Sequence, residues 1–233
     1  MRRLGLLGIY DPKVTASYCR AITQSVAERT DGSLASDVAI ENLWASEAGC
    51  KVGDGTSEAL GAHLLKGLER LVVADCEAAA LVDCDAHAFH PWLAERSPIP
   101  LVSMVDAVQD ELLRRSYERV MLLGTVPAMR DTFFKGQLAK AGLLVLAPGG
   151  ALRTWIGAVI TDELARGVVQ EETVSRFARL VEDGAEHGVD AIIVGCPELQ
   201  LLVDRLELGI PVVDVLGVHV RALVDVMLGE DLS

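Results

Sequence analysis

Aromatic residues are scarce in this chain of 233 residues. They make up 4% of it, whereas hydrophobic residues of all kinds make up 51%. The core must therefore consist mainly of Ala, Val and Leu, which is typical of helices packed on parallel strands. Basic residues are also few, 21 against 34 acidic ones, and the formal charge is -13. Because so acidic a surface is repelled by a phosphate backbone, we do not expect nucleic acid as a partner.

Long apolar runs are missing. None approaches the roughly 20 residues that span a bilayer, so we expect no membrane partner. The start of the chain, with two arginines before residues 4–9, resembles a signal peptide. The apolar stretch stops at Tyr10-Asp11-Pro12, however, and no small-residue cleavage site follows. We therefore interpret residues 4–9 as a buried first strand and expect a cytoplasmic protein.

Paired cysteines are missing as well. The five cysteines, at positions 19, 50, 76, 84 and 196, form no CxxC pair and no ligand cluster with histidine. We therefore expect neither a disulfide framework nor a metal site. His87 and His90 are suitably spaced on a helix, but no third ligand is evident. No G-x-G-x-x-G follows the first strand, which argues against a dinucleotide cofactor.

Short apolar runs alternate with longer segments of helical spacing along the chain. The runs predict eight strands, at residues 4–9, 38–41, 79–83, 101–103, 120–124, 143–147, 191–195 and 211–213. The clearest helical segments are residues 15–28, 57–72, 107–115, 129–141, 171–186 and 218–228. We interpret Gly149-Gly150 only as a turn. This alternation indicates an α/β fold with parallel strands and crossover helices.

Two stretches of the chain resemble each other. Residues 77–84 and 187–196 each contain a helix end, a buried strand and a cysteine where the strand stops. Each is followed by an x-Pro turn and another apolar strand. This repeat predicts two pseudo-symmetric lobes, each a mostly parallel sheet flanked by helices. We assign residues 1–100 plus 214–233 to the first lobe and residues 101–213 to the second.

The two strand-end cysteines, Cys84 and Cys196, are the main candidates for chemistry. Ligands of open parallel sheets bind beyond the carboxyl ends of the strands, and each predicted lobe has one of these thiols there. Facing lobes would place the thiols on opposite sides of a shared cleft. A thiolate and a thiol in that arrangement can invert a stereocentre without a metal or pyridoxal cofactor. The alternative is that a cysteine is simply a small buried hydrophobe, which we prefer for Cys19 and Cys76.

Five short segments stand out in order along nearly the whole chain. They are Gly8-Ile9-Tyr10-Asp11-Pro12, Cys84-Asp85-Ala86-His87, Leu122-Leu123-Gly124-Thr125, Gly195-Cys196-Pro197-Glu198, and Pro211-Val212-Val213-Asp214 with His219. Together they resemble the aspartate/glutamate racemase superfamily. The corresponding family motifs are Gly-Met-Gly-Pro, Cys-Asn-Thr with a nearby His, Leu-Ala-Thr, Gly-Cys-Thr-Glu, and Pro-Val-x-Asp followed by His.

The resemblance implies two α/β lobes with the active site in the cleft between them. It implies a two-base mechanism with Cys84 and Cys196 as the catalytic thiols, no cofactor, a small-molecule substrate and a homodimer. Matched positions that we expect to contact the substrate are Tyr10, Asp11, Asp85, Ala86, Thr125, Pro197, Glu198 and His219.

Several family positions are changed in this chain. Asp85 and Ala86 replace the Asn and Thr that hold the substrate, and Pro197 replaces a Thr and removes an N–H donor. An Arg that often binds the side-chain carboxylate is absent from residues 30–65. Arg166 is the best remaining anion partner, although a cation at a helix end is also suited to solvent.

These changes, with both thiols kept, suggest proton chemistry on an altered substrate. Asp85 is suited to pair with a cationic group, and by repulsion it would raise the pKa of the Cys84 thiol. We expect an isomerase, namely an amino-acid racemase or epimerase independent of pyridoxal phosphate. The alternatives are another cofactor-free isomerisation or decarboxylation of a small acid, and a relative that only binds small molecules. For His87 we expect a solvent-facing side chain, with a proton relay to Cys84 as the alternative.

Overall fold

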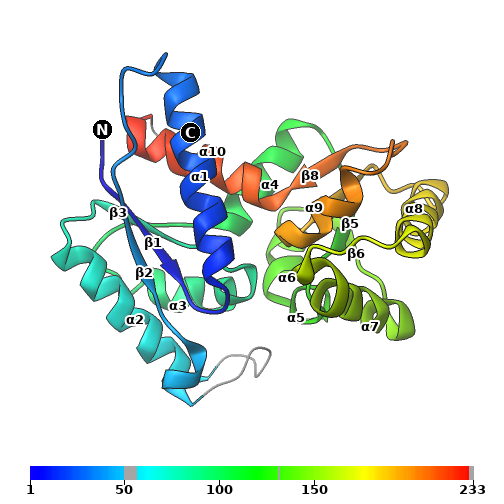
Figure 1. Cartoon of the computed structure of the whole chain (residues 1–233), viewed down its shortest axis with the longest axis horizontal. Helices are drawn as coiled ribbons and strands as arrows, with labels where there is room; N and C mark the ends of the chain where they lie inside the picture. The colour runs from blue at the N-terminus through cyan, green and yellow to red at the C-terminus, as the bar shows by residue number, and fades with distance from the viewer. Residues whose placement is uncertain (50–56, 131, 231–233) are drawn as a thin grey trace. The chain divides into compact units, whose positions relative to one another are not determined.

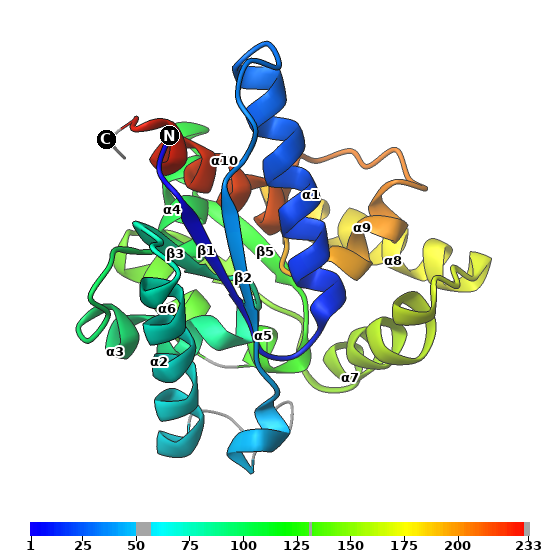
Figure 2. The same cartoon turned by 60° about the vertical axis from the view of Figure 1, so that its left-hand side comes forward.

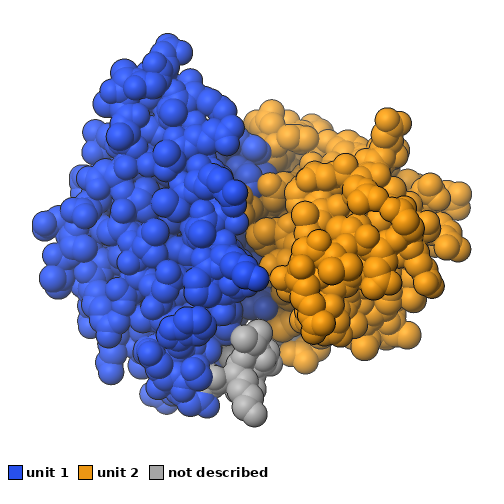
Figure 3. Space-filling view, viewed as in Figure 1, with its two compact units in different colours: residues 1–107, 217–233 blue, residues 108–216 orange. Residues whose placement is uncertain are grey.

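The computed structural model describes residues 1–49, 57–130 and 132–230 (Figure 1). Cys50 lies outside these residues. The chain forms two compact units, which Figure 3 shows in different colours. Unit 1 comprises Met1–Ala107 and Gly217–Ser233, and unit 2 comprises Val108–Leu216. None of the helices in the described part of the chain is both long and apolar enough to cross a membrane.

Unit 1 contains a sheet of four parallel strands. Their spatial order is β2 (Val38–Asn42), β1 (Leu4–Gly8), β3 (Ala78–Leu81) and β4 (Leu101–Val102). The helical elements of this unit are α1 (Pro12–Arg29), η1 (Ala45–Ala48), α2 (Glu58–Val73), η2 (Cys84–Phe89), α3 (His90–Ala94) and α10 (Val215–Leu228), with the first turns of α4 (Met104–Arg114).

The two faces of β1 are covered by different helices (Figures 1 and 2). A Cβ atom at Gly5 would lie 2.8 Å from Leu71 of α2. A Cβ atom at Gly8 would collide with the hydroxyl of Thr15 on α1 and with the amide oxygen of Asn42. Successive residues of a strand point to alternate faces, so positions 5 and 8 face α2 and α1 respectively. Glycine at the two positions lets both helices approach the sheet closely.

Unit 2 repeats this topology. Its parallel strands lie in the order β6 (Leu144–Leu146), β5 (Arg119–Leu123), β7 (Ala191–Val194) and β8 (Val212–Asp214). The helical elements are the rest of α4, α5 (Val126–Arg130), α6 (Thr132–Lys140), α7 (Gly150–Ala158), η3 (Val159–Glu163), η4 (Leu164–Arg166), α8 (Glu171–Glu186) and α9 (Pro197–Val203). The eight predicted strands, the parallel sheets and the repeat of two similar halves are therefore confirmed.

The predicted helix over residues 129–141 overlaps the end of α5 and all of α6, and residue 131 lies outside the described residues. Two expectations about other elements need correction. Gly149-Gly150 is not only a turn, because Gly149 is the N-cap of α7 and Gly150 its first residue. Residues 101–102, which we placed in the second lobe, form β4 and pair with β3 of the first sheet. A two-residue strand is too short to carry a periodic signal, so only the sheet pairing determines where it belongs.

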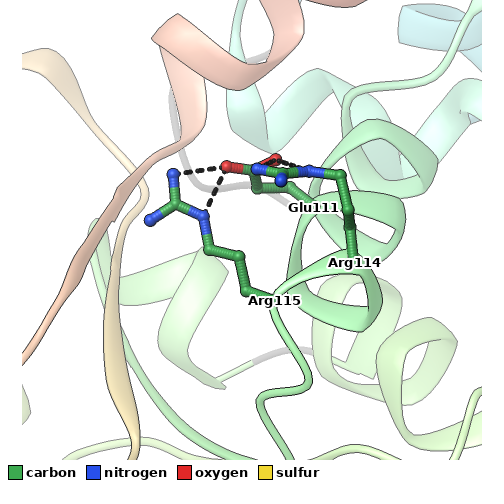
Figure 4. A network of polar contacts seen from close by, with 3 residues as sticks. All are labelled: Glu111, Arg114 and Arg115. Carbon is green, nitrogen blue, oxygen red and sulfur yellow. Dashed lines mark hydrogen bonds and ion pairs between the residues drawn. The ribbon is translucent and has the colours of Figure 1, made fainter.

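A network of charges fixes the end of α4 ahead of β5. The carboxylate of Glu111 is nearly buried, and it accepts hydrogen bonds from the guanidinium groups of Arg114 and Arg115 (Figure 4). Nε of Arg115 lies 2.7 Å from one oxygen of Glu111, and Nη2 of Arg114 lies 2.8 Å from the other. Two cations thus share one carboxylate at the end of the helix, where the helix dipole favours positive charge.

Candidate active site

The loop between β1 and α1 begins the candidate site in unit 1. Asp11 is the N-cap of α1, and its carboxylate accepts a hydrogen bond from the main-chain amide of Lys13 at 2.8 Å. Pro12 follows at the first helical position, where a missing N–H is harmless. Tyr10 and Asp11, both expected to contact substrate, are half-buried in this loop. The loop is therefore rigidly attached to the start of α1.

Asp83, which follows β3, reaches across to the same loop. Its carboxylate is 6% exposed and accepts a hydrogen bond from the amide of Ile9 at 2.8 Å. The amides of Tyr10 and Asp11 also hydrogen-bond to it. Burial raises the pKa of Asp83 to about 6, the three amide bonds oppose this rise, and the charge of Asp85 adds to it. Asp83 was not among our candidates, although a carboxyl at the end of an apolar strand indicates a group with specific partners.

Cys84, Asp85 and Ala86 form the start of η2, directly after Asp83. Cys84 and Asp85 are partly exposed. The side chain of Ala86 is instead 1% exposed and belongs to the hydrophobic core beneath α2. The turn is closed by a hydrogen bond from the amide of Ala86 to the carbonyl of Asp83 at 3.1 Å. Ala86 therefore anchors the turn, and a side-chain contact with substrate is not what its burial favours.

His87 is 2% exposed, so the expectation that it faces solvent is wrong. Its Nε2 lies 3.2 Å from the amide nitrogen of Met104, and its Nδ1 lies 3.2 Å from the carbonyl oxygen of Asp83. Because an amide can only donate, Nε2 must accept, and the ring proton is on Nδ1 and is donated to Asp83. Burial lowers the pKa of His87 well below its usual range, helped by His219 and His90. A neutral ring with both nitrogens bonded to the main chain is unsuited to relay protons to Cys84.

His219 on α10 is fully buried beside His87. Its Nε2 lies 3.3 Å from the carbonyl oxygen of Val102, so this nitrogen donates, and Nδ1 accepts from the hydroxyl of Tyr18 at 2.9 Å. Burial lowers the pKa of His219 to about 3, with a smaller contribution from His90. We expected His219 to contact substrate. These interior partners favour a structural role instead, because both ring nitrogens are already bonded.

The three histidines hold one short segment of main chain. Nε2 of His90 bonds to the carbonyl of Leu101 at 3.0 Å. The His90 and His87 rings stack at 5.8 Å, and His219 meets His87 edge-on at 5.5 Å. The histidines therefore fix residues 101–104, where β4 leads into α4, to the turn that begins at Cys84. Across the described ranges, no three His, Cys, Asp or Glu side chains are arranged to hold a metal ion.

Cys196 occupies the equivalent place in unit 2. It follows β7, forms the N-cap of α9, and is 8% exposed, with Pro197 as the first helical residue. The amide of Gly195 bonds to the carbonyl of Leu123 at 2.7 Å, which brings the ends of β7 and β5 together. Pro197 and Glu198 are half-buried in the first turn of α9.

Thr125 and Arg166 belong to neighbouring parts of unit 2. Thr125 follows β5, and its hydroxyl accepts from the amide of Ala128 at 3.3 Å, which caps α5. A Cβ atom at Gly124 would lie 3.5 Å from Cα of Gly195, so the strand ends that carry Thr125 and Cys196 are adjacent. Arg166 is exposed on η4, which packs against α9. Unit 2 thus gathers Thr125 with residues 196–198, and it places the turn that carries Arg166 against the same helix.

Each unit is a doubly wound parallel sheet with a cysteine beyond the carboxyl end of its third strand in spatial order. The chain belongs to the Asp/Glu/Hydantoin racemase family, whose sequence model matches residues 7–223. A Yersinia pestis protein described as a candidate Asp/Glu racemase is 26% identical, with a TM-score of 0.91 over 98% of this chain and 100% of that one.

Two further structures share the fold. An aspartate racemase homologue from Pyrococcus horikoshii OT3 is 24% identical, with a TM-score of 0.86 over 97% of this chain and 99% of that one. A mutant arylmalonate decarboxylase is 16% identical, with a TM-score of 0.59 over 97% of this chain and 93% of that one.

Proposed function

We propose that this protein is a cofactor-independent racemase or epimerase of an amino acid or a related small acid. The observation that carries the proposal is the matched placement of Cys84 and Cys196. Each thiol follows the third strand, in spatial order, of one of two sheets with the same topology. Membership in a racemase family agrees with this assignment.

In the proposed reaction one thiolate removes the proton from the carbon beside the substrate carboxyl group. The other cysteine, as a thiol, donates a proton to the opposite face of that carbon. The configuration is inverted, and the two cysteines exchange protonation states. A positioned acid and base of this kind need neither a metal nor pyridoxal phosphate. We also propose a homodimer in the cytoplasm, where thiols remain reduced.

The proposed substrate differs from aspartate and glutamate. Asp85 stands where the family has an amide that holds the substrate, and an ionised carboxylate accepts hydrogen bonds but donates none. It repels a carboxylate and attracts an ammonium or guanidinium group. We therefore propose a substrate with a cationic group near Asp85. Tyr10, Asp11, Thr125, Pro197 and Glu198 remain proposed contacts, with Arg166 as the proposed anion partner.

The test is exchange of the α-proton with D2O, followed by proton NMR. Both enantiomers of each amino acid are offered, including cationic ones, to the wild type and to Cys84→Ala and Cys196→Ala. Cys19→Ala on α1 is the matched control, because that thiol is also partly exposed but lies away from the strand ends. Exchange by the wild type and the control, with racemisation lost in both site variants, supports the proposal. Racemisation that survives either site substitution contradicts the two-thiol mechanism.

The unequal exposure of the two thiols favours a second candidate. Cys84 is partly exposed, whereas Cys196 is 8% exposed. After a decarboxylation releases CO2, the remaining carbanion needs only one proton donor, and the fold is shared with an arylmalonate decarboxylase. In that case one cysteine variant keeps its activity on a malonate-type acid. Another cofactor-free isomerisation of a small acid is the related alternative. Binding of small acids without any turnover would instead indicate a non-catalytic relative.

A further inference from the structure

Asp83, the residue before Cys84, makes hydrogen bonds in the candidate site of unit 1 with both its side chain and its main chain. Asp83 is the N-cap residue of η2, yet its carboxylate makes no capping bond to that turn. The carboxylate instead bonds to the amide of Ile9 at 2.8 Å and to the amides of Tyr10 and Asp11. A carboxylate suits three converging N–H groups because it offers two acceptor oxygens and no donor.

The main chain of Asp83 makes a second set of contacts on its other side. Its carbonyl accepts from the amide of Ala86 at 3.1 Å and from Nδ1 of His87 at 3.2 Å. These bonds close the turn that carries Cys84 and Asp85. One buried residue therefore links the loop at the end of β1 with the turn at the end of β3.

The burial of Asp83 is unfavourable for its negative charge. The group is 6% exposed, and Asp85 is a second carboxylate nearby. Buried charges that persist beside a strand end are frequently part of a functional arrangement. The three amide bonds provide the compensation, and they all come from the β1–α1 loop.

We propose that Asp83 is a positioning residue that holds the β1–α1 loop and the Cys84 turn in fixed register, so that substrate groups bound by the loop face the thiol. The claim that bound substrate faces the thiol rests on the proposed function. The claim that Asp83 holds the loop and the turn together is independent of it.

Three proteins test this inference: Asp83→Ala, the milder Asp83→Asn, and the matched control Asp190→Asn. Asp190 is a suitable control because its carboxylate also accepts two main-chain amides of a neighbouring strand, from Glu118 and Arg119. It precedes β7, at the amino end of the second sheet, whereas Cys196 follows the carboxyl end of that strand. Amide hydrogen exchange by mass spectrometry monitors residues 9–11 and 84–89. Alkylation of Cys84, followed peptide by peptide, reports the placement of the thiol.

We expect at least tenfold faster amide exchange at residues 9–11 in Asp83→Ala and a severalfold change in the alkylation rate of Cys84. Asp83→Asn, which keeps one acceptor oxygen, should lie between the wild type and Asp83→Ala. Exchange in β1 and β3 should stay as in the wild type, which shows that unit 1 is folded. Once a substrate is known, Asp83→Asn should lower kcat more than it raises KM. A displaced thiol impairs the proton-transfer step, whereas substrate binding is largely retained.

Unchanged exchange at residues 9–11 and unchanged alkylation in both Asp83 variants would overturn the inference. If no substrate is found, exchange and alkylation still decide whether Asp83 fixes the register. If racemisation needs both cysteines but the Asp83 variants behave like Asp190→Asn, the inference fails and the proposed function remains.

Discussion

The hydroxyl of Tyr18 donates a hydrogen bond of 2.9 Å to Nδ1 of His219, although 201 residues separate the two in the sequence. Both side chains are buried, and His219 also bonds to the carbonyl of Val102. Helix α10, on which the chain returns to unit 1, is thereby joined to α1 and β4. This bond belongs to the interior that supports the Cys84 turn.

Replacement of Tyr18 by Phe should destabilise the protein while leaving its shape intact. The variant removes only the hydroxyl and leaves Nδ1 of His219 buried without that donor. An unsatisfied buried group costs about 1–3 kcal/mol, so we expect a loss of that size in the free energy of unfolding. Urea unfolding measures it, and Tyr117→Phe outside this cluster is the control. A loss no larger than that of the control would contradict the assigned bond.

Acid should destabilise the protein through its buried histidines. In the unfolded chain a histidine takes up a proton as the pH falls through about 6.5. Folded His219, with its pKa lowered to about 3, and folded His87 remain neutral. The unfolded state therefore binds more protons below pH 6.5, and stability is lost as the pH falls from there towards 3.

Each such histidine changes the free energy of unfolding by at most about 1.4 kcal/mol per pH unit. Urea unfolding at pH 7, 6 and 5 should show a smaller slope in His219→Gln than in the wild type. The exposed His187, replaced in the same way, serves as the control. Equal slopes in all three proteins would argue against a neutral, buried His219.

Asp83 should have the opposite effect to the histidines on the pH dependence of stability. Its pKa of about 6 in the folded state lies above the ordinary carboxyl value of 3.8, so the folded state binds the extra proton between these values. The stability linked to this proton is present below pH 3.8 and is lost as the pH rises through 6. The wild type loses this stability as the pH rises, whereas Asn does not titrate. The free energy of unfolding of Asp83→Asn, relative to that of the wild type, should therefore increase by up to about 3 kcal/mol between pH 4 and pH 8. A pH-independent difference between the two proteins would show that Asp83 is not perturbed.

Replacement of Asp85 by Asn should shift the substrate preference towards acidic amino acids. The change removes a negative charge and restores a hydrogen-bond donor at a partly exposed position. We expect kcat/KM for L-aspartate to rise by about tenfold, which corresponds to about 1.4 kcal/mol, and activity on a cationic substrate to fall. Asp75→Asn, at an exposed turn of the same unit, is the control. If the wild type already acts on L-aspartate as fast as Asp85→Asn, the proposed role of Asp85 is wrong.

The fold was largely predictable because its signals are local. Strands such as residues 191–194 are short continuous apolar runs, and α8 was predicted with the bounds that it has in the structure. The repeated strand–cysteine pattern predicted two equivalent sheets. Elements with weak local signals were not predicted correctly. Helix α7 was missed because it begins at two glycines, which are typical of a turn. Strand β4 was assigned to the wrong lobe because two residues carry no periodicity.

The site was predictable in part. The sequence alone identified Cys84 and Cys196 as strand-end thiols, since a cysteine after a buried apolar run needs no knowledge of distant contacts. Whether both are catalytic stays a prediction. The burial of His87 and His219 and the role of Asp83 were decided only by the tertiary structure. Polar side chains become interior when partners from remote segments satisfy them, as Met104, Tyr18 and Ile9 do here, and no local pattern specifies such partners.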